Sequence, residues 1–179
     1  IYAFKLHAKY ANDYMNYVMP PESTVQPIDN HYRQQELYVT LSNLFSFTKW
    51  WSVNLSADAQ WNRLDAQGSE SFNMHFVKPR RYTLLGAAAT SLTFRHFSVQ
   101  ASALYTFVHD VSARGFPVAG NKSILTPTLI ASYSPWKKAG LDFRAFYQTI
   151  FRMPTFHDLY YVQFARSLPK PEYSTQYNI

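Results

Sequence analysis

The sequence predicts an all-β protein whose antiparallel strands form part of a transmembrane β-barrel. Three observations predict this fold. Apolar and polar side chains alternate with a period of two along most of the chain, which is the pattern of strands with two different faces. The connections between these strands are alternately long and short, as in membrane barrels. Aromatic side chains, 18% of the chain, gather near both ends of the strands.

The composition agrees with this fold and excludes several others. Charged residues make up 16% of the chain, against roughly 25% in soluble domains. No apolar run approaches the ~20 residues of a membrane-spanning helix, and the mean hydropathy of −0.28 suits strands whose faces alternate. Cysteine is absent, so thiolate chemistry and cysteine metal sites are excluded. The net charge of +6 is scattered rather than gathered in a basic stripe, so we expect no nucleic-acid partner.

The first half of the chain contains three alternating runs and two long connections. Residues 1–10 alternate strictly, and prolines and Asn-Asp pairs then predict a loop from Asn12 to about Tyr32. Alternation returns at residues 37–46, and a brief turn at Thr48-Lys49 leads into the cleanest run, residues 52–62. A second long polar loop is expected over residues 63–80.

The second half repeats this arrangement. Two expected strands, residues 82–94 and 97–107, are joined by a two-residue turn at Arg95-His96. A third long loop covers about residues 109–123. The next two strands, 125–133 and 141–151, flank a tight turn at 135–140. Pro154 lacks a backbone donor and ends the last of these strands, and Thr155 can cap a short helical turn after it. A further strand begins after Glu172.

Aromatic residues occupy both ends of the expected strands, where the two interfacial girdles of a membrane barrel lie. Those near the short turns are Trp50, Trp51, Phe94, Phe97, Tyr133 and Trp136. Those at the opposite ends are Tyr10, Trp61, Tyr82, Tyr105, Phe107 and Tyr147. The polar faces carry mainly Ser, Asn, Gln and Thr rather than the Lys and Glu of a water-exposed sheet, which favours a wet lumen over a soluble β-sandwich.

One segment near the end of the chain resembles a known family. It runs Phe-Arg-Met-Pro-Thr-Phe-His-Asp-Leu-Tyr-Tyr over residues 151–161, and Lys170-Pro171-Glu172 and Ser174-Thr175-Gln176-Tyr177 follow it. This pair of motifs is similar to a segment of TonB-dependent outer-membrane receptors. Met153, His157 and Leu168-Pro169 depart from the family's usual residues.

The resemblance implies a barrel of about 22 strands, closed by an N-terminal plug. Residues 1–179 would then be about eight strands of this single outer-membrane barrel domain, without the plug and the barrel termini. It implies a receptor in the outer membrane of a Gram-negative cell, in contact with the lipid bilayer, that takes up a scarce nutrient such as a ferric siderophore, cobalamin or a similar chelate. The inner-membrane protein TonB would act through the missing plug.

No catalytic motif is present, so we expect no enzyme and no resident cofactor or metal. Residues of the expected outer loops are instead candidates for binding a ligand. They are Arg152, His157, Tyr160, Tyr161, His109 and His75. Arg152 can meet an anionic ligand or pair with Asp158 or Glu172.

Two alternative functions remain at this stage. In haem-capturing members of the family a histidine in the interval occupied by His157 is a ligand, so a haem receptor of the same fold is one alternative. The other is a small structural or adhesive barrel, or a soluble carbohydrate-binding β-domain.

Overall fold

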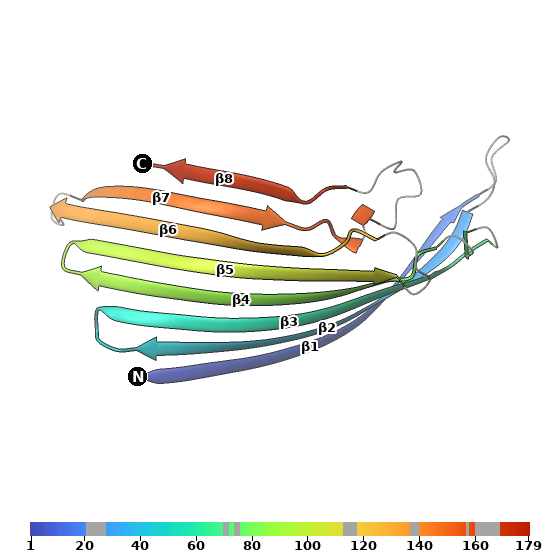
Figure 1. Cartoon of the computed structure of the whole chain (residues 1–179), viewed down its shortest axis with the longest axis horizontal. Coiled ribbons are helices and arrows are strands. Elements are labelled where there is room, and N and C mark those ends of the chain that lie inside the picture. The colour runs from blue at the N-terminus through green and yellow to red at the C-terminus, as the bar shows by residue number, and fades with distance from the viewer. Residues whose placement is uncertain are drawn as a thin grey trace.

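The computed structural model describes residues 1–20, 28–69, 72–73, 76–112, 118–136, 140–156, 158–159 and 169–179. These residues form one antiparallel sheet of eight strands, each paired with the next along the chain (Figure 1). The strands are β1 (Tyr2–Met19), β2 (Ile28–Ser46), β3 (Trp51–Gln67), β4 (Pro79–Phe94), β5 (Phe97–Ser112), β6 (Lys122–Trp136), β7 (Leu141–Arg152) and β8 (Glu172–Asn178). The prediction of an all-β antiparallel fold is confirmed. In the described part of the chain β1 and β8 are the edges of the sheet, which is not closed.

The sheet has two chemically different faces, because directly paired residues point to the same side. One row of paired residues crosses six strands as Leu6, Leu41, Ala57, Gly86, Tyr105 and Leu125, and we call this side the apolar face. A row on the other side crosses four strands as Lys9, Tyr38, Gln60 and Thr83, and we call that side the polar face. Large side chains of the apolar face are exposed, among them Phe4, Leu6, Leu84, Leu125 and Phe143.

The strands extend further than the sequence predicts at the end of the sheet with the long connections. β1 continues to Met19 instead of ending near Tyr10, and β2 begins at Ile28 within the expected loop. β3 likewise continues to Gln67. The polar residues that predict a loop here instead pair across the strands. Arg33 Nε donates to Asn12 Oδ1 at 2.9 Å, so these polar side chains satisfy one another within the ladder.

The short turns lie at the opposite end, as Figure 1 shows for β2–β3 and β4–β5. Arg95 has a φ of 51°, the left-handed conformation that a two-residue hairpin turn requires, so the predicted Arg95-His96 turn is confirmed. His96 Nδ1 lies 2.8 Å from the carbonyl oxygen of Ser134, which ties this turn to β6. The expected turn at 135–140 begins later, because β6 continues to Trp136, and residues 137–139 lie outside the described residues.

A small buried cluster lies on the polar face, near the long connections. It consists of Tyr32, Leu64, Ala66, Phe76 and Phe156, with Phe72 packed against it. Leu64 is fully buried, and the rings of Tyr32 and Phe76 meet edge to face with centroids 6.5 Å apart. The sheet therefore has a packed core only at this end, and Phe156 joins it from the segment that follows β7.

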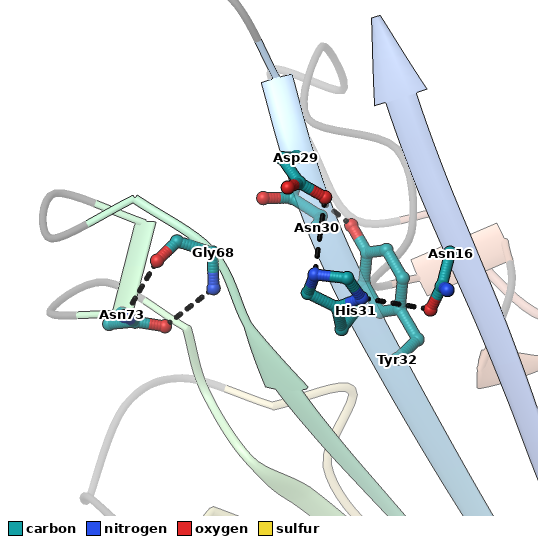
Figure 2. Close-up of polar contacts among 7 residues, drawn as sticks. All are labelled: Asn16, Asp29, Asn30, His31, Tyr32, Gly68 and Asn73. Carbon is teal, nitrogen blue, oxygen red and sulfur yellow. Dashed lines mark hydrogen bonds and ion pairs between the residues drawn. The ribbon is translucent and has the colours of Figure 1, made fainter.

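Gly68 closes this core tightly. Asn73 holds its backbone through two hydrogen bonds, one to the amide nitrogen at 2.9 Å and one to the carbonyl oxygen at 2.8 Å (Figure 2). A Cβ at Gly68 would lie 2.1 Å from Oδ1 of Asn30, a side chain that is itself buried. Since real Cβ contacts are never so short, any side chain at this position must displace Asn30 or the backbone of Gly68.

We expect Gly68→Ala to lower the free energy of unfolding by about 1–3 kcal/mol, because it overpacks this corner. Gly86→Ala is the matched control, since a Cβ there meets nothing within 4 Å. That control should be neutral or stabilise the strand by about 0.5–1 kcal/mol. Urea titration of the protein in detergent micelles, followed by tryptophan fluorescence, measures both. Equal effects at the two glycines would contradict this packing.

Candidate functional site

The centre of the candidate site is a buried ion pair on the polar face. Arg81 of β4 lies directly opposite Asp110 of β5 in the register. Its Nε donates to Asp110 Oδ1 at 2.7 Å and its Nη2 donates to Oδ2 at 2.7 Å, which is the two-pronged geometry of a strong arginine–carboxylate pair. The side chain of Arg81 is 9% exposed and that of Asp110 is fully buried.

Arg81 also binds the segment that follows β7. Its Nη1 donates to the carbonyl oxygen of Pro154 at 2.6 Å. Its guanidinium lies over the ring of Phe156, 5.2 Å from the centroid, in a cation–π contact. The buried Arg81 therefore connects the Pro154-Thr155-Phe156 sequence to β4, at a sequence separation of 73 residues. Pro154 and Phe156 are both buried.

The segment holds its own shape through Thr155 and Asp158. Thr155 Oγ1 accepts from the backbone amide of Asp158 at 3.2 Å, and Asp158 Oδ2 accepts from the amide of Thr155 at 2.9 Å. This reciprocal pattern is a capping box. The amide of Leu159 then donates to the carbonyl oxygen of Thr155 at 3.1 Å, which closes one helical turn. The predicted cap at Thr155 is confirmed.

An open cavity of about 400 Å³ lies between this segment and the polar face. Glu36 borders it and accepts from Lys9 Nζ at 3.2 Å and from Gln60 Nε2 at 3.0 Å. Asn62 also borders it, is 7% exposed, and has a side-chain oxygen with no hydrogen-bond partner among the described residues. Asn62 Oδ1 is therefore an acceptor without a partner among the described residues at the border of this cavity, whereas Glu36 and Gln60 are already bonded. Its lining also includes Arg81, Thr83, Thr106, Phe151 and Met153.

The structure describes two of the six predicted ligand-binding residues. Arg152 is exposed at the end of β7, directly opposite Glu172 of β8 in the register. His109 lies on the apolar face, where its Nδ1 is 2.6 Å from Asn121 Oδ1. The remaining four, His75, His157, Tyr160 and Tyr161, lie outside the described residues.

These two residues do not form one site. In the register His109 pairs with Tyr82, whose exposed ring belongs to the apolar face. His109 therefore lies on the side of the sheet opposite the buried Arg81–Asp110 pair, which belongs to the polar face. Arg152 makes no ion pair within the described part of the chain. Its predicted pairing with Asp158 is absent there, because Asp158 bonds to Thr155 instead. Glu172 faces Arg152 only as a neighbour in the register.

Sequence reasoning missed the ion pair, although the sequence carries a signal for it. Arg81 is the second residue of a short basic run and attracts no attention by itself. In a hairpin with a two-residue turn, residues at equal distances before and after the turn face each other. Arg81 and Asp110 are equally far from the Arg95-His96 turn, so the sequence places them opposite each other. Opposite charges at directly paired positions attract each other across a sheet. The contact of Arg81 with Pro154 has no comparable local signal.

Within the described ranges, no three His, Asp or Glu side chains come together as metal ligands. No helix formed by those residues is long and apolar enough to cross a membrane. In comparisons with known proteins, no family model and no curated protein matches this chain.

We expect Asp110→Ala to destabilise the protein by about 3–5 kcal/mol, because it leaves the Arg81 charge buried without its partner. The double variant Arg81→Met, Asp110→Leu should recover most of this loss, since apolar residues of similar volume replace the pair. It should still release the 151–156 segment, which limited proteolysis detects as new cleavage there. Asp13→Ala is the control, with an effect within about 0.5 kcal/mol, because this carboxylate is exposed and has no ion pair among the described residues. A double variant as unstable as Asp110→Ala would contradict this account.

Proposed function

We propose that this chain is part of the barrel wall of a TonB-dependent receptor in the outer membrane of a Gram-negative cell. The receptor takes up a scarce nutrient, such as a ferric siderophore, cobalamin or a similar chelate. The observation that carries the proposal is the exposed apolar face of the sheet. On the opposite, polar face, Arg81 contacts Pro154 and Phe156 of the segment that resembles the receptor family.

The apolar face supports a membrane location. Its exposed side chains are aliphatic in the middle of the strands, as at Leu41, Leu55 and Leu129. Toward the short turns they become aromatic, with Trp50, Phe94, Phe97, Tyr133 and Trp136 all exposed. Toward the long connections the exposed aromatics are Tyr10 and Tyr82, which lie in one row across the sheet. An apolar band between two aromatic belts matches the thickness and chemistry of a bilayer, whereas a soluble protein seldom exposes so large an apolar surface.

The polar face supports a lumen. It carries hydrogen-bonded networks, such as Tyr38 and Thr40, which both donate to Asp58, and Gln60, which donates to Glu36. Residues 151–156, which begin the segment with the family resemblance, contact this face and leave an open cavity beside it. In the proposed receptor the long connections contact the ligand at the outer surface. The ligand then passes along the polar face when TonB moves the plug.

We expect Ala57→Arg to destabilise the protein by about 2–4 kcal/mol in lipid bilayers, because it puts a charge near the bilayer midplane. Ala57 lies between Leu41 and Gly86 on the apolar face. Ser56→Arg is the matched control, since the adjacent residue points to the polar face and its charge stays in water. Unfolding from vesicles in urea measures both. Equal costs at the two positions would exclude a bilayer on the apolar face.

We expect cells that produce the full-length receptor to take up its chelate only with TonB and a proton gradient. The double variant Tyr160→Ala, Tyr161→Ala should weaken binding to whole cells about tenfold, through loss of aromatic stacking. Tyr133→Ala with Phe143→Ala is the control, because these aromatics are exposed on the apolar face away from the ligand loops. Binding of radiolabelled ferric siderophores and cobalamin identifies the ligand.

Other outcomes of this experiment favour the alternatives. Haem binding with a Soret band that His157→Ala abolishes would identify a haem receptor. Recovery of the protein in the soluble fraction, with affinity for a carbohydrate, would favour a soluble β-domain. Uptake that does not depend on TonB would contradict the proposed mechanism.

A further inference from the structure

A group of cations lies on the apolar side of the sheet, near the long connections. Three of them lie beside or opposite a single carboxylate, Asp65, and they are Arg33 of β2, Arg63 of β3 and Lys78 immediately before β4. The fourth is Arg80 of β4, which lies opposite Arg63. We call these four cations the basic cluster. Arg33 pairs with Asp65 in the register, and Arg63 pairs directly with Arg80.

Among the described residues, the charges of the basic cluster are only partly balanced by carboxylates. Arg63 Nη2 lies 2.6 Å from Asp65 Oδ2, and Lys78 Nζ lies 3.8 Å from its other oxygen. Arg33 has only neutral partners there: Asn12 accepts from its Nε, and its guanidinium lies 5.4 Å from the centroid of the Tyr14 ring. Asp65 is thus the one carboxylate that pairs with the basic cluster among the described residues.

The pairing of Arg63 with Arg80 is an independent sign of a missing anion. Like charges at directly opposed positions of a sheet repel each other and destabilise the pair. The repulsion disappears if an anion bridges the two guanidinium groups. Phosphate suits this position, because its oxygens match the planar donor array of arginine.

The place of the basic cluster relative to the apolar face identifies the source of the anion. The preceding row on the same face contains Tyr10, Leu37, Trp61 and Tyr82. Arg63 follows Trp61, and Arg80 precedes Tyr82, by two residues along the strand, or about 6.7 Å. In a bilayer the aromatic row lies at the interface with the headgroups. The cations one step further along the strands therefore lie at the level of the lipid phosphates.

The surface here is hollowed. An open cavity of about 540 Å³ is lined by Arg33, Arg63, Lys78, Asp65, His31 and Tyr14, among others. Arg80 does not line it and adjoins it through its pairing with Arg63. His31 borders it in a fixed orientation, because its Nδ1 lies 2.9 Å from Asn16 Oδ1 and its Nε2 lies 3.2 Å from Asp29 Oδ1 (Figure 2). The cavity is large enough for a phosphate and part of the group that carries it.

We propose that the basic cluster binds the phosphate groups of anionic membrane lipids whose chains cover the apolar face. This inference rests on the membrane location in the proposed function, and it does not depend on TonB or on the nutrient. Arg63 and Arg80 bridge one phosphate, Lys78 and Arg33 flank it, and Asp65 keeps Arg63 and Lys78 in position. The cluster thereby fixes the depth of this part of the wall in the bilayer.

The test is binding of the full-length protein, in neutral detergent, to short-chain phosphatidylglycerol and phosphatidylcholine, followed through the fluorescence of Trp61 and the other tryptophans. We expect tighter binding of phosphatidylglycerol, weakened about tenfold or more in Arg63→Gln, Arg80→Gln and by added salt. The matched control is Lys5→Gln, Arg144→Gln, which removes the same charge from exposed positions of the polar face and should leave the preference unchanged. If the double variant does not fold, Arg80→Gln alone should weaken phosphatidylglycerol binding about threefold or more.

Three results would overturn the proposal. One is equal affinity for the two lipids in the unchanged protein. Another is the same loss of affinity in the control variant. The third is inorganic phosphate that binds as tightly as phosphatidylglycerol, which would make the cluster a site for a free anion. A protein that fails to enter vesicles of either lipid would instead refute the membrane location, so the two failures are distinguishable.

Discussion

The bidentate contact between Arg81 and Asp110 is the interaction on which the rest of the described structure depends. A buried guanidinium costs much free energy unless its donors are satisfied. Here Asp110 satisfies two donors and the carbonyl oxygen of Pro154 satisfies a third. The pair is therefore stable only with the segment after β7 in place, and that segment in turn brings Phe156 into the buried cluster. Sheet and segment stabilise each other through one side chain.

The register determines where this contact can form. Each residue of a strand points to the side opposite its neighbours, so a shift of one position would move Arg81 from the polar to the apolar face. The short turn at Arg95-His96 and its bond to β6 prevent such a shift between β4 and β5. Arg80 and Arg81 are adjacent in sequence, yet they serve opposite faces. Arg81 holds the folded segment, and Arg80 belongs to the basic cluster.

Much of the fold could be predicted from the sequence, because it follows from local patterns. Alternation predicted the strands and their faces, and the Arg95-His96 turn fixed one register. The sequence predicted that β1 and β3 end several residues before they do in the structure. Polar residues such as Asn12 and Arg63 resemble loop residues in isolation, and they belong to strands only because they pair with residues of neighbouring strands. The Arg81–Pro154 contact could not be predicted, because no local pattern links residues so far apart in the chain. Of the predicted ligand residues, the structure describes Arg152 and His109 and places them apart.

The Phe-Arg-Met-Pro-Thr-Phe segment divides its residues between structure and binding. Pro154, Thr155 and Phe156 are committed to the fold, through the bond to Arg81, the capping box and the buried cluster. Arg152 differs from them, because it is exposed and its side chain makes no hydrogen bond or ion pair within the described part of the chain. A guanidinium keeps its charge at any physiological pH. The residues that follow it are held by these contacts, and the backbone of Arg152 is paired with Glu172 of β8. In the proposed receptor, Arg152 is therefore the described member of the motif whose donors are left to meet an anionic chelate.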